Sequence, residues 1–365
     1  MIRFFRYIQA ADWFLISGVF TLVTLGLAAI YSVELSFGNS DFLNVGKQLA
    51  AAAAGVAAFA LLARSNYHLL RNYALVSYVA GLVLLAGVLI FGTTVRGTTG
   101  WYALGPVSFQ PVEFMKLALA IALAAYFSRR ARVDFGWREL FESGLITAVP
   151  VGFVLLQPDL GSALLLMGMW GILVLFAGMK KRHLAALASV FAVISVVAWM
   201  FLLAPYQKDR ILTFANPAMD PLGQGYNVAQ AIIAVGAGGW FGRGLGFGSQ
   251  SQLKFLPEAQ TDFIFAVIAE ELGFVGILLL LSAFAVVLFR IWRIASRTSD
   301  DFTSYLLIGI GGVLFVQFFV NAGMNLGLLP VTGVALPFVS YGGSSLFFAL
   351  AMAGIVESVA MRSRR

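Results

Sequence analysis

The chain has 365 residues, of which 60% are hydrophobic and 11% charged, and its mean hydropathy of +0.90 is far above that of a soluble domain. It contains no cysteine and two histidines, which excludes disulfides and thiolate metal sites and argues against a histidine-built metal site. The net charge of +7 does not indicate nucleic acid, because 17 of the 24 basic residues lie in every second connection and at the termini, all on the side that the positive-inside rule assigns to the cytoplasm. The composition therefore predicts an integral membrane protein.

Apolar segments long enough to cross about 30 Å of hydrocarbon recur along the whole chain. Ten spans are predicted, at about 14–31, 47–63, 72–91, 112–128, 143–157, 160–178, 184–204, 262–289, 303–325 and 342–360. The fifth and sixth are separated by Gln157, Pro158 and Asp159, where the proline ends one helix and the aspartate caps the next. We expect one all-α polytopic bundle over residues 1–365, with both termini in the cytoplasm.

The connection between the seventh and eighth spans, at about 205–261, is far longer than a usual loop and is expected on the extracytoplasmic side. Within it, GYNVAQAIIAVGAGGWFGRGLG from Gly225 predicts a short apolar helix and a glycine-rich turn, suited to the membrane surface. Because long surface loops often carry function, we expect the site here and at the mouths of the neighbouring spans.

Asp262 opens the eighth span directly after this loop. Thr261 can cap the helix and an acid in the first turn complements the helix dipole, so a purely stabilising role is one interpretation. The other is a general base, because partial desolvation at the outer mouth of a span raises the basicity of a carboxylate. Glu270 and Glu271 lie about 12–13 Å deeper along the helix. Both are expected to make structural polar contacts, although Glu270 could also line the same cavity as Asp262.

Glu113 and Lys116 are three residues apart at the start of the fourth span and can share one helix face. They form either a neutralising pair or a site in which Lys116 tunes Asp262 or meets an anionic substrate. The external basic residues are Arg96, Lys208, Arg210, Arg243 and Lys254. They are either solvated and headgroup-facing side chains or, as a group, ligands of a diphosphate. These features leave open both a transporter and a membrane enzyme that acts on a phosphorylated lipid.

Five segments, in order along most of the chain, carry a family resemblance. They are FQPVEFMK from Phe109, QPDLGSA from Gln157, GYNVAQAIIAVGAGG from Gly225, GSQSQLKFLPEAQTDFIFAVIAEELGFVG from Gly248 and LLPVTGVALPFVSYGGSS from Leu328. The sequence resembles the SEDS family (shape, elongation, division and sporulation), and SQSQLKFLPE is more similar to its rod-elongation branch than to its division branch. Gln260 departs from the usual His of the family, and Gly100-Trp101 departs from its Arg-Trp pair.

The resemblance implies a peptidoglycan glycosyltransferase of the bacterial inner membrane that polymerises lipid II on the extracytoplasmic face. It also implies a class B penicillin-binding transpeptidase and other elongation-complex proteins as partners. The essential acid of the family corresponds to Asp262. As general base it would deprotonate the 4-hydroxyl of the acceptor GlcNAc, which attacks C1 of the donor MurNAc with inversion and expels undecaprenyl diphosphate. One carboxylate suffices because the diphosphate is already a good leaving group.

The leaving diphosphate requires positive charge, and a divalent cation such as Mg²⁺ or Mn²⁺ could assist. The residues assigned to substrate binding are Lys116, Arg210, Arg243, Lys254, Trp101 and Glu258; Asp262 and Glu258 are the candidate metal ligands; and Glu113, Asp159 and Glu270 are expected to be structural or tuning. Two rival functions remain. A lipid II flippase would need a charged path to both faces, and a non-catalytic scaffold for the transpeptidase would not need Asp262.

Overall fold

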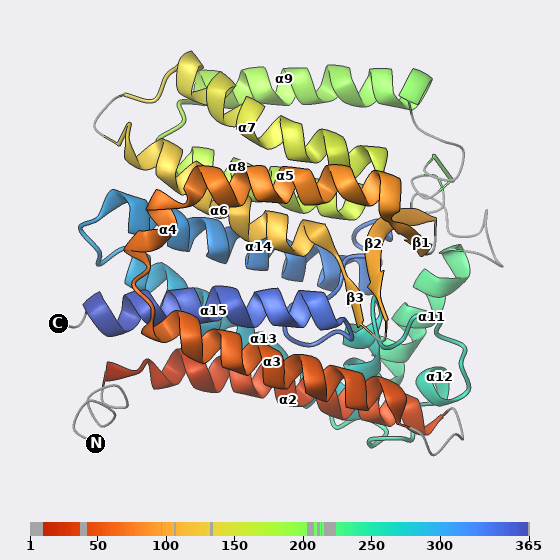
Figure 1. Ribbon diagram of the computed structural model, residues 1–365. Helices are drawn as coiled ribbons and strands as arrows, with labels where there is room; N and C mark the ends of the chain where they lie inside the picture. Colours follow the sequence, from red (N-terminus) through yellow and green to blue (C-terminus); the bar gives the residue numbers. More distant parts are fainter. Residues whose placement is uncertain are drawn as a thin grey trace.

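The computed structural model describes residues 10–36, 42–95, 97–105, 107–131, 134–202, 208–209, 212, 214 and 224–363. Within these residues, nine helices are long and apolar enough to cross a membrane, and a further apolar helix, Leu160–Phe176, has 17 residues. The helices run side by side in one bundle, and α2 begins at the same end at which α15 finishes (Figure 1). We call this the terminal end and the opposite end the site end.

Every predicted span has its helix. The long helices are α2 (Trp13–Leu35), α3 (Leu43–Arg64), α5 (Ala74–Phe91), α6 (Pro111–Ser128), α7 (Trp137–Leu156), α8 (Leu160–Phe176), α9 (Lys181–Val197) with the π-helical η1 (Ala198–Leu202), α13 (Ile264–Ala295), α14 (Asp301–Asn325) and α15 (Gly343–Ser363). The short ones are α4 (His68–Asn72), α11 (Gln224–Ala237) and α12 (Ser249–Gln252). The predicted break between the fifth and sixth spans is present, because the Asp159 carboxylate accepts the Ser162 amide at 2.9 Å and caps α8.

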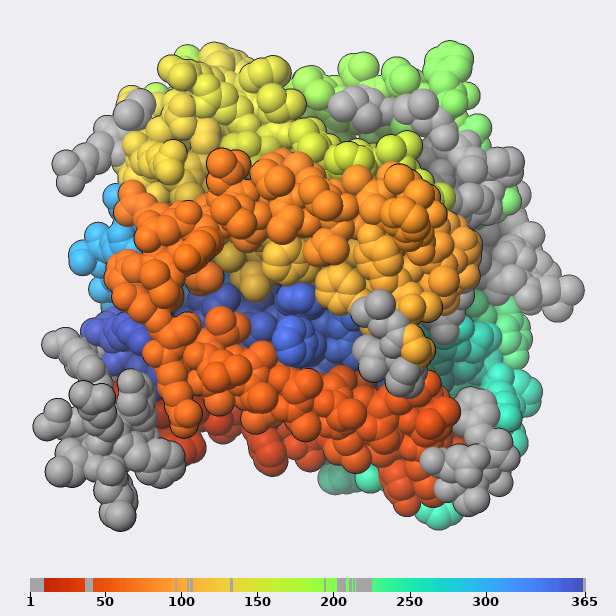
Figure 2. All heavy atoms as spheres, viewed as in Figure 1, coloured from red at the N-terminus to blue at the C-terminus, as the bar shows by residue number. Residues whose placement is uncertain are grey.

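Helices α6, α14 and α15 form the centre of the bundle. Helix α15 packs on α3, α14 packs on α6 and α8, and α13 packs on α2 and α14. Figure 2 shows the same side, where the atoms of α15 are visible between those of α3 and α5. Helix α9 lies at the edge and exposes Phe191, Val193 and Val197, as a lipid-facing helix would.

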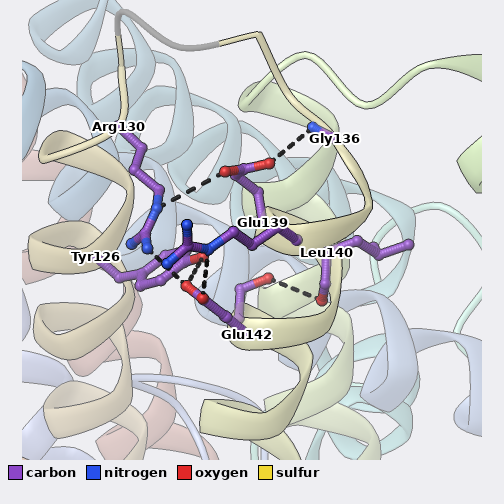
Figure 3. A network of polar contacts seen from close by, with 8 residues as sticks. Tyr126, Arg130, Gly136, Glu139, Leu140 and Glu142 are labelled. Carbon is purple, nitrogen blue, oxygen red and sulfur yellow. Dashed lines mark hydrogen bonds and ion pairs between the residues drawn. The ribbon is translucent and has the colours of Figure 1, made fainter.

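A polar network joins α6 to α7 at the terminal end (Figure 3). The Glu142 carboxylate accepts hydrogen bonds from the Tyr126 hydroxyl at 2.9 Å, Arg130 at 2.7 Å and Arg138 at 2.8 Å. Glu139 accepts the Gly136 amide at 2.9 Å and so satisfies a backbone donor at the start of α7. The network therefore fixes the corner between the two helices.

A small antiparallel sheet follows α5, where the sequence predicted a plain connection. It consists of β1 (Thr93–Val95), β2 (Thr98–Leu104) and β3 (Val107–Phe109), in the order β1-β2-β3. The Tyr102 hydroxyl donates to the Leu84 carbonyl at 3.0 Å, and the Ser344 hydroxyl of α15 donates to the Ser108 carbonyl at 3.0 Å. The sheet is thereby attached to the bundle at the site end, the end that also carries α11 and α12 (Figure 1).

Helix α13 is interrupted at Gly273, where φ is +64° and ψ is −160°. The glycine-rich turn after α11 pairs with the backbone on both sides of the break. Before the break, the carbonyls of Glu270 and Glu271 accept the amides of Arg243 and Gly244, each at 2.9 Å. After the break, the amides of Phe274 and Val275 donate to the carbonyls of Gly239 and Trp240 at 2.9 and 3.1 Å. A Cβ added to Gly273 would lie 2.2 Å from the Gly242 nitrogen, so this approach requires glycine.

The break divides α13 into a membrane segment and an outer segment. Residues 274–295 number 22 and, at about 1.5 Å per residue, are about 33 Å long. That length alone crosses the hydrocarbon layer of about 30 Å. The outer segment, from Ile264 to the break, therefore belongs with the loop that pairs with it, and Glu270 and Glu271 lie in this segment rather than deep in the span.

Candidate active site

Asp262 lies in a turn just before α13 rather than in the helix. Its amide donates to the Glu258 carbonyl at 3.1 Å, and α13 begins at Ile264. The predicted cap by Thr261 is wrong, because the Thr261 hydroxyl instead donates to the Glu258 carboxylate at 3.1 Å. Phe263, the residue at the cap position, has no side chain able to bind the first amides of the helix.

Two buried asparagines of α14 hold the backbone of this turn. The Nδ2 groups of Asn321 and Asn325 each donate to the Asp262 carbonyl at 2.9 Å. Asn321 also donates to the Val334 carbonyl at 2.7 Å, and Gln317 donates to the Ala335 carbonyl at 2.9 Å. Helix α14 thus binds both the Asp262 turn and the loop that leads to α15. The sequence analysis missed these residues, although three amide side chains at i, i+4 and i+8 of an apolar helix are a detectable signal.

The loop between α14 and α15 holds the turn from a second side. The Ser340 hydroxyl donates to the Thr261 carbonyl at 2.5 Å, and the Tyr341 amide donates to the Gln260 carbonyl at 2.8 Å. Burial, reinforced by the carboxylate of Glu34, raises the pKa of Tyr341, so its hydroxyl stays neutral.

Helix α3 holds the Asp262 turn from a third side, through Gln260, the residue that stands where the SEDS family usually has His. The Gln260 side chain is 8% exposed and accepts a hydrogen bond from Asn44 at 3.1 Å. Gln260 is therefore a buried link between α3 and the Asp262 turn.

Gly333 lies beside the Asp262 carboxylate. Its φ is +71°, and a Cβ added there would lie 3.7 Å from Oδ2 of Asp262. The absence of a side chain at Gly333 thus leaves room next to one carboxylate oxygen.

Glu113 and Lys116 form a buried ion pair. Lys116 Nζ lies 2.6 Å from Oε2 of Glu113 and donates to Oε1 of Gln317 at 3.0 Å. Lys116 is 1% exposed. Gln317 precedes Asn321 by four residues, so Lys116 contacts α14 about 6 Å, one helical turn, away from the residue that binds Asp262.

The other predicted site residues that the structure describes are distributed over the site end. Lys254 and Glu258 are exposed in the segment that leads to Asp262. Arg243 lies in the glycine-rich turn after α11, and its Nε donates to the carbonyl of Ala237, the last residue of α11, at 2.9 Å; Trp101 lies in β2. Arg210 lies outside the described residues.

Glu270 and Glu271 make structural contacts, as expected. Glu270 accepts the amides of Gln250 at 2.7 Å and Ser251 at 3.1 Å, which fixes α12. Glu271 accepts the Ser32 hydroxyl of α2 at 2.6 Å. Both carboxylates therefore join the outer segment of α13 to its neighbours.

The described part of the chain brings together no group of three His, Asp or Glu side chains that could hold a metal ion. Asp262 and Glu258 share one turn, and Mg²⁺ is usually held by one or two carboxylates together with substrate phosphates. The metal role of these two carboxylates stays a prediction.

An apolar cavity of about 520 Å³ lies between α11, α13 and α14. Its lining includes Val235, Phe265, Phe274, Phe318 and Leu329 and contains no charged side chain among the described residues. The described lining of this cavity therefore offers no charged side chain for acid–base chemistry.

Comparison with known proteins identifies the family. Residues 12–365 match the family model for the cell cycle proteins FtsW, RodA and SpoVE. Stage V sporulation protein E of Bacillus subtilis is 37% identical over 97% of this chain and 98% of its own length. The peptidoglycan glycosyltransferase MrdB of Escherichia coli K12 is 38% identical over 93% and 91%.

Solved structures agree over nearly the whole chain. The rod shape determining protein RodA of Thermus thermophilus superposes with a TM-score of 0.72 at 33% identity, covering 97% of this chain and 98% of that one. A chain from a peptidoglycan synthase complex, described as coordinating polymerization and crosslinking, gives a TM-score of 0.80 at 35% identity, covering 97% and 99%. The chain therefore belongs to the FtsW/RodA/SpoVE family of cell cycle proteins, the SEDS family that its motifs indicated.

Proposed function

We propose that this protein is a peptidoglycan glycosyltransferase that polymerises lipid II, with Asp262 as its general base. Relatives named as peptidoglycan glycosyltransferases support the activity. The observation that carries the assignment of the base is the turn itself: α14 and the loop before α15 bind its backbone, α3 binds the side chain of Gln260 within it, and the Asp262 carboxylate lies beside Gly333. A reacting group fixed in this way is preorganised, which is a large part of catalytic rate enhancement.

The reaction needs one proton acceptor. Asp262 takes the proton from the 4-hydroxyl of the acceptor GlcNAc as its oxygen forms a bond to C1 of the donor MurNAc. The bond from C1 to the diphosphate oxygen breaks on the opposite face, and undecaprenyl diphosphate leaves with the electron pair, so the configuration at C1 inverts. A diphosphate leaves as a stable anion and requires no second carboxyl group as acid, unlike the leaving group of a glycosidase.

Basic side chains at the site end would stabilise the departing diphosphate. Lys254 is exposed in the segment before Asp262 and is the basic residue nearest to it in sequence. Arg243 and Arg210 are further candidates from the same long loop. Lys116 is fully buried against Glu113 and Gln317, so we assign it to the support of the site rather than to a first contact with substrate.

We place the site end on the extracytoplasmic face and both termini in the cytoplasm of a bacterial inner-membrane protein. The basic loops around Arg64, Arg130, Lys181 and Arg293 connect helices at the terminal end, which the positive-inside rule assigns to the cytoplasm. A class B penicillin-binding transpeptidase is the proposed partner, within a larger elongation complex. The similarity to a chain of a synthase complex that coordinates polymerization with crosslinking supports this proposal.

Polymerisation of labelled lipid II by the purified protein tests the proposal. Asp262→Asn is expected to lower the rate by about 10²–10⁴-fold, the usual contribution of a general base. Asp134→Asn is the matched control, because its side chain is 96% exposed at the terminal end. Full activity of a folded Asp262→Asn variant would refute the assignment of the base. Polymer formed by the wild-type chain without a partner would exclude both the flippase and the scaffold.

A further inference from the structure

Helix α13 receives its N-terminal cap from another helix. A helix usually begins with a Ser, Thr, Asp or Asn whose side chain accepts the amide of the second or third helical residue. Phe263 occupies that position in α13 and makes no such bond. The amide of Ala266, the third helical residue, instead donates to Oδ1 of Asn325 in α14 at 3.2 Å.

The Asn325 side chain also binds the Asp262 carbonyl, the backbone group that the Ala266 amide would bind in a longer helix. In a helix extended backward by one residue, the Ala266 amide would donate to the Asp262 carbonyl, four residues earlier. Here the Asp262 carbonyl accepts Nδ2 of Asn325 at 2.9 Å. The carboxamide of Asn325 therefore lies between the two partners of a helical hydrogen bond and bonds to both. The first bond within α13 follows at once, from the Val267 amide to the Phe263 carbonyl at 3.2 Å.

Asn321 reinforces this insertion. Its Nδ2 donates to the same Asp262 carbonyl at 2.9 Å, and its backbone carbonyl accepts Nδ2 of Asn325 at 2.9 Å. Both asparagines are 0% exposed. Burying an amide is costly unless its donors and acceptor are satisfied, and here they are satisfied largely by the Asp262 turn and the start of α13.

We propose that Asn325, supported by Asn321, is a positioning residue that keeps Asp262 from becoming the N-cap of α13. Without it, the Asp262 carbonyl and the Ala266 amide can bond directly, and the helix gains a residue at its start. That residue is Phe263, so Asp262 would become the N-cap, and an N-cap aspartate turns its carboxylate toward the amide of the second or third helical residue. The Asp262 side chain would thereby turn away from its place beside Gly333. This inference rests on the proposed function, in which that carboxylate accepts the proton.

Kinetics test the consequence for the reaction. Asn325→Leu has a similar side-chain size but cannot bridge the two backbone groups, and Asn72→Leu, at an exposed position of α4, is the matched control. We expect kcat for lipid II polymerisation to fall about 10²-fold, the typical effect of a 1 Å misplacement, while KM stays within a few-fold of wild type. In the Asp262→Asn background, Asn325→Leu should cause no further loss, because it acts through Asp262. A KM increase at unchanged kcat would overturn the proposal.

A labelling experiment separates the position of residue 262 from its chemistry. The chain contains no cysteine, so Asp262→Cys provides a single thiol. Its rate of reaction with a water-soluble maleimide should change several-fold when Asn325→Leu is added and should not change with Asn72→Leu. An unchanged rate would overturn the positioning role, whatever the activity. A changed rate together with a fully active Asp262→Asn would leave the positioning role standing and refute the proposed base. If Asn325→Leu does not fold, Asn325→Ser, which is polar but too short to bridge both groups, replaces it in both experiments.

Discussion

The buried pair of Glu113 and Lys116 makes a sharp prediction about stability. At 2.6 Å and an effective dielectric constant of about 20, the attraction between the two charges is about 6 kcal/mol. Removing both ions from water costs several kcal/mol each, so the pair as a whole contributes little net stability. Lys116→Met would leave Glu113 buried without its cation, and we expect a loss of about 3–5 kcal/mol.

The double variant Glu113→Gln with Lys116→Met should recover most of that loss, because no unpaired charge remains. Thermal unfolding in detergent, followed by the loss of monodisperse protein, measures both variants against wild type. Lys116→Met with wild-type stability would refute the reasoning. Polymerisation by the double variant then isolates function: if it folds like wild type but lacks activity, Lys116 supports the reaction beyond its role in the pair.

Three further predictions concern single positions. Gly333→Ala should lower both the melting temperature and the rate of polymerisation. The control Gly178→Ala, at a position with a φ of +92° and open space around it, should lower only the melting temperature. Equal polymerisation rates of the two variants would contradict the role of the space beside Asp262. Gly273→Ala should increase limited proteolysis of the 238–248 turn, because its Cβ would lie 2.2 Å from the Gly242 nitrogen; an unchanged cleavage pattern would contradict the backbone pairing. Arg130→Gln should cost about 1 kcal/mol or less, since its ion pairs are partly exposed, and should leave polymerisation unchanged; a large loss of activity in folded protein would contradict a purely structural network.

The helices of the bundle could be predicted from the sequence because the signals that define each one lie within the helix itself or next to its ends. Each span is a run of apolar residues, and the division between the fifth and sixth spans is marked by a proline and a capping aspartate that act within a few positions. The short helix α11 and the glycine-rich turn after it were likewise predicted from composition alone.

The site could be predicted only in part, because its geometry depends on contacts between distant segments. Asp262 stands out by position, but the helix that follows it is capped by Asn325, 63 residues after Asp262, and not by the adjacent Thr261. The break at Gly273 was missed because a glycine inside an apolar run does not by itself interrupt a helix. The sheet at 93–109 was missed because its strands are short and their pairing depends on neighbouring helices.

The interruption of α13 also bears on how the protein enters its membrane. A hydrophobic stretch of 22 residues after Gly273 is sufficient to be recognised and inserted by itself. The outer segment that carries Glu270 and Glu271 then needs no lateral partition into lipid, and its two acids impose no insertion penalty. Biogenesis of the span and assembly of the Asp262 turn are thus separable events, and the turn can form last, when α14 arrives with the asparagines that complete it.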